Sequence, residues 1–273
     1  MDPRLQRRVQ RYGWDKASPY YEIFWQNQLK PAQELLIEMA DFKLGENVLD
    51  IACGTGLVSF SALEKLGVHG RVLGTDISER MVEIASSLAV MKKEGRVQFQ
   101  RMDAEELSLA DNIYDVSLCA LGLMYMPDPR KALEEMHRVL KPGGRVVAAV
   151  WGQRDQCGWA DIFEIVDRHV ASEVCPMFFN LGNPDMLSLH FKTAGFAEIK
   201  VQRIKTILTY KNEEEALGAA FDGGPVALAY HKFSDQIKQE VHTAYLSSIA
   251  QFKQGPGYDI PGEFVIARGQ RLS

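Results

Sequence analysis

The alternation of apolar and polar positions between residues 46 and 151 predicts strands that alternate with helices. Short apolar runs rich in β-branched residues predict strands at 47–52, 71–76, 96–103, 114–121 and 145–151. Apolar residues at helical spacing predict helices at 57–66, from Ser78 onward, and from Pro129 to 140. This order of elements favours a parallel sheet with helices on both faces. We therefore expect an α/β fold with a doubly wound, mostly parallel sheet.

The pattern changes after Trp151, where longer helical stretches predominate. Helices are expected around 159–170 and from 183 to Gly195, and strands at 198–210 and 262–270 complete a seven-stranded, Rossmann-like sheet. Roughly fifty mainly helical residues separate those last two strands, far too many for a hairpin turn. We expect one domain, 1–273, with a helical cap (1–40), an α/β core (41–210 and 258–273) and a helical insertion (211–257) that serves as a substrate lid.

A glycine-containing turn follows the first strand, in the run Asp50-Ile-Ala-Cys-Gly-Thr-Gly56. Glycine lets the backbone turn sharply and lets a ligand approach closely, and such a turn lies where ligands bind parallel sheets. The next strand ends at Asp76, twenty residues after Gly56, where a carboxylate accepts hydrogen bonds from ribose hydroxyls. The two features together indicate an adenosine-containing ligand.

Two classes of cofactor use this arrangement, and the residues favour one of them. A dinucleotide site requires a third glycine where this chain has Ser59. The carboxylate of Asp50 would repel a pyrophosphate, whereas it suits a ligand that carries an ammonium or a sulfonium. The sequence favours the cationic cofactor, with an NAD(P)-dependent oxidoreductase or a non-catalytic S-adenosylmethionine-binding regulator as alternatives.

Five motifs in order carry a family resemblance over residues 46–152. The run 50–56 resembles the D-x-x-x-G-x-G signature of the class I S-adenosylmethionine-dependent methyltransferases, and 74–81, 102–104, 115–129 and 138–144 resemble the four motifs that follow it. The most similar branch is that of the small-molecule enzymes related to the ubiquinone and menaquinone biosynthesis C-methyltransferases. The resemblance implies S-adenosylmethionine as cofactor, with S-adenosylhomocysteine as its product.

The resemblance also implies a role for individual residues at the cofactor. Asp50 and the turn would hold the methionine moiety, Asp76 the ribose and Asp103 the adenine amino group, while Tyr21 would close over the cofactor from the cap. The cofactor-binding residues expected in this way are Tyr21, Asp50, Ala52, Gly54, Gly56, Asp76, Ile77, Met81, Met102, Asp103, Ala104, Cys119, Ala120 and Leu121.

The acceptor is expected to be small and apolar or aromatic, methylated on oxygen or carbon mainly by alignment and exclusion of water. Related quinone enzymes often place a histidine pair where this chain has Met124 and Tyr125, so histidine chemistry is not expected at that position. No catalytic base is assigned. The candidates for the substrate pocket are Trp25, Met124, Tyr125, Phe178, Phe179, Phe221 and His231.

Composition and charge exclude several other functions. The chain is 46% apolar and 25% charged with a net charge of −5, so the basic residues near its start are expected to form a solvated helix face rather than to bind nucleic acid. These basic residues are Arg4, Arg7, Arg8 and Arg11.

The cysteines and the apolar runs complete the sequence-based expectations. The four cysteines lack metal-ligand spacing, which predicts no metal site and fits a reducing, cytoplasmic compartment. No run reaches the roughly 18 apolar residues of a membrane span. The expected partner is a small-molecule substrate, and the pattern indicates no oligomeric state.

Overall fold

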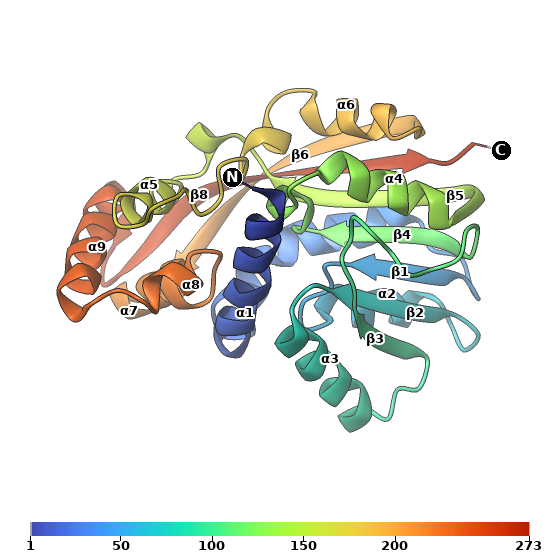
Figure 1. The fold of residues 1–273 in the computed structure, drawn as a ribbon, viewed down its shortest axis with the longest axis horizontal. Helices are drawn as coiled ribbons and strands as arrows, with labels where there is room; N and C mark the ends of the chain where they lie inside the picture. Colours follow the sequence, from blue (N-terminus) through green and yellow to red (C-terminus); the bar gives the residue numbers. More distant parts are fainter. Residues whose placement is uncertain (1, 273) are drawn as a thin grey trace.

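A mixed sheet forms the centre of this computed structural model, which describes residues 2–272 and, over that range, holds eight strands (Figure 1). The strand order is β3-β2-β1-β4-β5-β8-β6, with the two-residue β7 paired to β8. Strands β1 to β5 run parallel, whereas β8 is antiparallel to both β5 and β6. The seven expected strands are present, and β7 is an addition. The bounds are β1 Asn47–Ile51, β2 Arg71–Asp76, β3 Val97–Arg101, β4 Tyr114–Ala120, β5 Leu140–Trp151, β6 Ala197–Tyr210, β7 Lys253–Gln254 and β8 Gly257–Gln270.

The strand order places a switch point between β1 and β4. The chain proceeds from β1 outward to β2 and β3, and then returns to the other side of β1 to form β4. Both strands are buried along nearly their whole length because helices cover both faces of a parallel sheet. The crevice beyond the carboxyl ends of β1 and β4 is therefore the position at which this topology binds ligands.

Helices between the strands begin at residues that cap them. Ser78 accepts a hydrogen bond from the Met81 amide at the start of α3, and Asp128 does the same for Lys131 at the start of α4. The helix expected at 159–170 is shorter than predicted, because 158–161 form turns before α5 begins. The bounds are α2 Leu57–Lys65, α3 Glu79–Met91, α4 Pro129–Val139, α5 Ile162–Asp167 and α6 Met186–Thr193, with short 3-10 turns at Leu123–Tyr125, Arg154–Gln156 and Asn180–Gly182.

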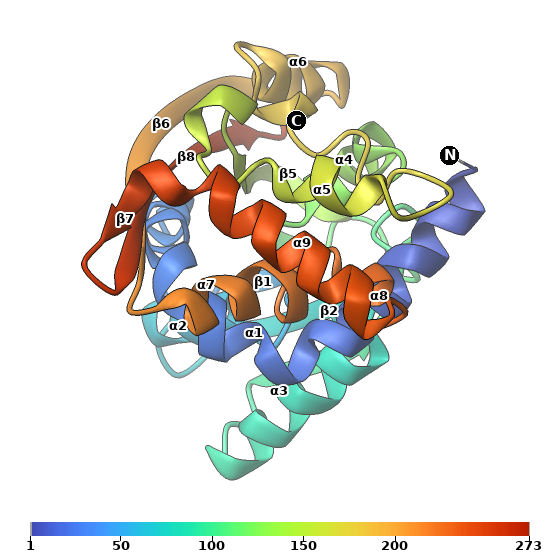
Figure 2. The ribbon, with the colours of Figure 1, turned by 90° about the vertical axis from the view of Figure 1, so that its left-hand side faces the viewer.

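One long helix, α1 (Pro3–Ala40), forms the cap. It crosses the carboxyl ends of the parallel strands and lies between the sheet and the helices of the insertion, as Figure 1 and Figure 2 show from two sides. Its buried residues recur at helical spacing along one face, as expected for a helix that packs on a core. They include Gln6, Gln10, Gly13, Ala17, Trp25, Leu29, Ala32 and Leu36.

The insertion between β6 and β8 is mainly helical, and two glycines bring it close to α1. A Cβ on Gly13 would lie 3.7 Å from Leu228 Cβ, and one on Gly218 would collide with the ring of Phe24 at 2.2 Å. Strand β8 begins at Gly257, five residues before the predicted start. The elements are α7 Glu213–Leu217, a π-helical turn at Gly218–Asp222, α8 Ala227–Tyr230, α9 Asp235–Ser248 and a 3-10 turn at Ala250–Phe252.

Replacing Gly56 with alanine is expected to destabilise the fold more than a strained backbone alone would. Gly56 has φ +91°, and its Cβ would lie 2.8 Å from Cζ of Phe99. Gly143 has φ +79° with nothing within 4 Å of a Cβ, so Gly143→Ala measures the backbone cost alone, about 1 kcal/mol. We expect Gly56→Ala to lower the free energy of unfolding by about 1–3 kcal/mol more than Gly143→Ala does in denaturant titrations. Equal losses in both variants would contradict the packing argument.

Candidate cofactor and acceptor site

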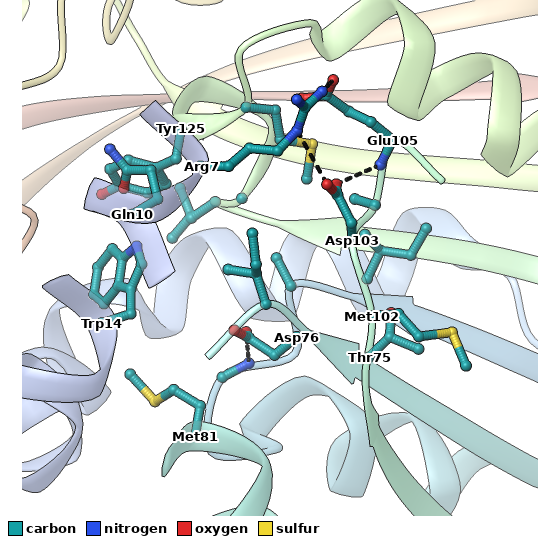
Figure 3. A pocket seen from close by; sticks show the side chains of 18 of the residues that line it. Arg7, Gln10, Trp14, Thr75, Asp76, Met81, Met102, Asp103, Glu105 and Tyr125 are labelled. Atoms are coloured by element: carbon teal, nitrogen blue, oxygen red, sulfur yellow. Dashed lines mark hydrogen bonds and ion pairs between the residues drawn. The ribbon is translucent and has the colours of Figure 1, made fainter. Parts of the chain in front are cut away.

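A cavity, about 760 Å³ including its part open to solvent, lies at the switch point, at the carboxyl ends of the parallel strands (Figure 3). The segments after β1, β2, β3 and β4 form its floor and sides, and α1 contributes the remaining wall. Its lining includes Ala52, Gly54, Thr75, Asp76, Ile77, Met81, Met102, Asp103, Ala104, Ala120 and Leu121, together with Arg7, Gln10, Trp14 and Tyr21 from α1. We call it the cofactor cavity.

The carboxylate of Asp76 holds two sides of the cofactor cavity together. Its Oδ2 accepts a hydrogen bond from the Gly54 amide at 2.9 Å, and its Oδ1 accepts one from the Ser78 amide at 2.8 Å. Asp76 thereby connects the glycine turn after β1 to the start of α3. Burial raises its pKa to about 6, and these amide bonds oppose the shift.

Asp50 lies fully buried beneath the glycine turn. The Ser59 hydroxyl donates a hydrogen bond to Oδ2 at 2.5 Å, while Oδ1 has no hydrogen-bond partner among residues 2–272. Burial raises the pKa of Asp50 to about 7. An unpartnered buried carboxylate oxygen costs free energy, which a cation bound near the turn would offset. This residue therefore fits a positively charged cofactor, although its side chain does not line the cavity.

The far end of the cofactor cavity combines apolar side chains with one acidic residue. Ile77, Met81, Met102 and Ala104 line it, and their character suits a flat heterocycle. Oδ1 of Asp103 accepts a hydrogen bond from the Glu105 amide at 2.9 Å, and Oδ2 pairs with Arg7 Nε at 3.0 Å (Figure 3). The carboxylate predicted to meet adenine is thus also paired with α1.

The amino-terminal half of α1 is fastened over this cavity by polar contacts. Arg7 pairs with Asp103 and Glu105, and Arg11 pairs with Glu79 at 3.2 Å. The prediction that the basic face is merely solvated is therefore wrong for Arg7, because helix α1 turns it toward the buried Glu105, whereas Arg11 and Glu79 form an exposed pair.

Two further residues of α1 join this closure. Oδ1 of Asp15 accepts hydrogen bonds from the Ser78 hydroxyl at 2.6 Å and from the Arg80 amide at 3.2 Å. Tyr21 stands against the glycine turn, since a Cβ on Gly54 would lie 3.7 Å from its Cε1. Burial and the nearby Asp76 charge raise the pKa of Tyr21, so its hydroxyl stays a neutral donor.

A second cavity, about 370 Å³ including its part open to solvent, adjoins the first, and we call it the aromatic chamber. Trp14, Tyr21, Leu121 and Tyr125 line both cavities. The Trp14 ring meets those of Tyr21 and Tyr125 edge-on, with centroids 5.9 and 5.1 Å apart. The rest of the chamber is lined by Trp25, Leu29, Trp151, Trp159, Phe178, Gly224 and Pro225, and no Asp, Glu, Lys, Arg or His is found among its described lining residues.

Most of the predicted cofactor residues gather at the cofactor cavity, and three lie outside its lining. Asp50 lies beneath the turn, Gly56 packs against Phe60 and Phe99, and Cys119 is buried within β4. Those that line it are Tyr21, Ala52, Gly54, Asp76, Ile77, Met81, Met102, Asp103, Ala104, Ala120 and Leu121.

The predicted substrate residues divide in the same way. Trp25, Tyr125 and Phe178 line the aromatic chamber. Met124, Phe179, Phe221 and His231 lie outside its lining. Met124 and Phe179 neighbour lining residues, and successive side chains point in different directions, so both pack elsewhere in the core. Phe221 packs within the insertion against Tyr230 and Tyr245, and His231 lies at the surface 3.6 Å from Asp222.

Sequence reasoning missed several lining residues, and a helical pattern could have found those in α1. Positions 7, 10, 14, 21 and 25 follow intervals of three, four and seven, which place them on one helix face. Trp151 and Trp159 lie at the end of β5 and in the turn before α5, where no periodic signal marks them.

The described residues contain neither a metal-ligand cluster nor a membrane-spanning helix. Within residues 2–272, no group of three or more His, Cys, Asp or Glu side chains is placed to hold a metal ion. No helix in that range combines the length and the apolar character needed to cross a membrane.

Asp50→Asn is expected to stabilise the ligand-free protein at high pH and not at low pH. Since burial raises the pKa of Asp50 from 3.8 to about 7, the folded state binds this proton more tightly than the unfolded state. The contribution of Asp50 to stability therefore falls as the pH rises from about 4 to about 7, and a neutral amide removes that loss. We expect a gain on the order of 2 kcal/mol at pH 8 and little change at pH 4 in denaturant titrations.

The exposed Asp155→Asn serves as the control for this measurement. It should give no comparable gain that depends on pH. A gain of equal size at pH 4 and pH 8 in Asp50→Asn would show that the charge of Asp50 is not its cause.

Comparisons with known proteins agree with this geometry. The family described as "Methyltransferase domain" matches residues 42–177. The demethylmenaquinone methyltransferase of Listeria monocytogenes is 32% identical over 162 residues, covering 58% of this chain and 68% of the relative. That of Geobacillus kaustophilus is 27% identical over 225 residues, covering 74% and 94%.

A solved structure shares the fold. Phosphoethanolamine N-methyltransferase 2 of Haemonchus contortus, in complex with S-adenosylhomocysteine, superposes with a TM-score of 0.62 at 19% identity and covers 95% of this chain and 58% of its own. These findings do not support the oxidoreductase alternative. The chain belongs to the class I S-adenosylmethionine-dependent methyltransferases of the small-molecule branch, and it transfers the methyl group of that cofactor to a small molecule.

Proposed function

We propose that the methyl acceptor is an apolar, ring-containing molecule that binds in the aromatic chamber. The observation that carries this proposal is the shared boundary of the two cavities, formed by Trp14, Tyr21, Leu121 and Tyr125. An acceptor in the chamber would face the cofactor across that boundary. The relatives named for demethylmenaquinone support the same class of acceptor.

The cofactor would be held by the polar groups around the glycine turn. Asp76 would accept hydrogen bonds from the ribose hydroxyls, Asp103 would face the adenine amino group, and Met81 would pack on the ring. The buried charge of Asp50 would attract the cationic end. The cofactor supplies an electrophilic methyl group on a sulfonium.

The chain would promote transfer by alignment and by exclusion of water. The aromatic lining gives the acceptor flat, apolar surfaces, and the ionisable groups of the described chamber wall are the phenols of Tyr21 and Tyr125, whose pKa values are raised by burial. Neither phenol serves as a base near neutral pH. We therefore propose methylation of an electron-rich oxygen or carbon whose proton passes to water rather than to a side-chain base, while the C–S⁺ bond breaks and S-adenosylhomocysteine leaves.

The cap (1–40) and the insertion (211–257) would together act as the substrate lid. Gly224 and Pro225, between the π-helical turn and α8, line the chamber opposite the core strands. Helix α1 packs against α8 and against that turn. Access to the chamber would therefore depend on these two segments.

Asp76→Ala is expected to weaken binding of S-adenosylmethionine about 10- to 100-fold in calorimetric titrations, because a charged hydrogen-bond acceptor is lost from the site. Binding to the unmodified protein should also weaken as the pH falls from 8 to 5. Protonation of Asp76, whose pKa is about 6, removes the negative charge that attracts the cation.

Glu34→Ala, on the outer face of α1, is the control and should bind as the unmodified protein does. Affinity that is indifferent to both Asp76→Ala and pH would rule out this role for Asp76.

Methyl-labelled S-adenosylmethionine tests the acceptor class directly. We expect label to pass to phenols and fused-ring hydroxy compounds that partition into organic solvent, since the chamber offers no charged partner. Mixtures with Asp76→Ala should transfer far less label to every acceptor. Transfer confined to charged amines, carboxylates or peptides would overturn the proposed acceptor.

A further inference from the structure

Two buried tryptophans of the aromatic chamber have indole N–H groups without a hydrogen-bond partner. Nε1 of Trp25 and Nε1 of Trp159 are inaccessible to solvent and find no acceptor in the described part of the chain. The two residues are 8% and 5% exposed, and their rings meet edge-on with centroids 6.4 Å apart. Both line the chamber.

This arrangement is unusual because buried tryptophan N–H groups normally have a partner. The Nε1 edge of Trp25 lies near the loop of the insertion, since a Cβ on Gly224 would be 4.0 Å from that nitrogen. A Cβ on Gly223 would be closer still, at 3.3 Å, so this edge of the ring faces the 223–224 loop, of which Gly224 lines the chamber. Trp159 packs edge-on against Phe178 at the same wall.

The remaining side chains of the chamber offer no evident acceptor for these donors. Its described lining holds no carboxylate, amide or imidazole side chain, and its hydroxyl oxygens, those of Tyr21 and Tyr125, accept from neither indole. A ligand that provides hydrogen-bond partners for the two indole N–H groups must therefore carry acceptor oxygens. A pure hydrocarbon would leave both N–H groups unpaired.

We propose that the methyl acceptor carries a carbonyl or phenolic oxygen that accepts hydrogen bonds from the indole N–H groups of Trp25 and Trp159. This inference rests on the proposed function, because it takes the aromatic chamber as the acceptor site. The two tryptophans then determine specificity as well as shape. A site built around buried donors rejects a ligand that lacks the matching acceptor more strongly than it rejects a small change in size.

A matched pair of probes tests the inference by nuclear magnetic resonance. The protein, labelled with ¹⁵N in its four tryptophans and saturated with S-adenosylhomocysteine, is titrated with 2-acetylnaphthalene and with 2-ethylnaphthalene, which differ chiefly by one carbonyl oxygen. We expect the indole proton signals of Trp25 and Trp159 to move downfield with the acetyl compound only. Single Trp→Phe variants assign each signal by its disappearance.

The same variants supply a binding test. Trp25→Phe and Trp159→Phe should each reduce the preference for the acetyl over the ethyl compound about ten-fold, the loss of one hydrogen bond of about 1.4 kcal/mol. Phe178→Leu is the matched control, because Phe178 lines the same chamber and carries no hydrogen-bond donor. Unchanged affinity for S-adenosylhomocysteine shows that each variant is folded.

The outcomes distinguish a failure of the hydrogen-bonding role from a failure of the proposal that the acceptor binds in the aromatic chamber. If both probes bind and the two indole signals respond alike to each, or if Phe178→Leu removes the preference equally, the hydrogen-bonding role is overturned and the chamber remains the acceptor site. If S-adenosylhomocysteine binds and neither probe does, the chamber is not the acceptor site and both conclusions fall.

Discussion

The burial of carboxylates at the carboxyl ends of β1 and β2 is the constraint on which the site depends. Asp76 uses both oxygens to connect the glycine turn with the start of α3, and Asp50 lies beneath the same turn with one oxygen unpartnered among the described residues. Removing these charges from water is costly, and it raises both pKa values toward neutrality. That cost is tolerated at a position where a cationic cofactor offsets it, and the surrounding loops take their shape from these bonds.

Helix α1 converts this open edge of the sheet into an enclosed site. Arg7, Arg11 and Asp15 fasten it to acidic and amide groups around the cofactor cavity, while Trp14, Tyr21 and Trp25 supply much of the aromatic lining. The polar end and the aromatic end of one helix face thus correspond to the two cavities. Along that face, the charged residues lie at the cofactor cavity and the aromatic residues lie at the aromatic chamber.

The sequence predicted the parallel core well because its signals are local. The strands from β1 to β4 end within two residues of the predicted positions, and Asp76 and Ser78 mark a strand end and a helix cap by their own chemistry. The start of β8 was missed because Pro261 and Gly262 resemble a boundary, although β8 pairs with β6 through both positions. Arg7 was assigned to solvent because its acidic partners lie about a hundred residues away in the chain, and periodicity alone carries no such information.

The shared wall between the cavities has a thermodynamic consequence. Trp14, Tyr21, Leu121 and Tyr125 touch both spaces, so any ligand that orders these side chains from one side prepares the surface seen from the other. By reciprocity, the factor by which the methyl donor alters affinity for the second substrate must equal the factor by which that substrate alters affinity for the donor. The binding of two small molecules to a single chain can thus be cooperative because the same side chains line both sites.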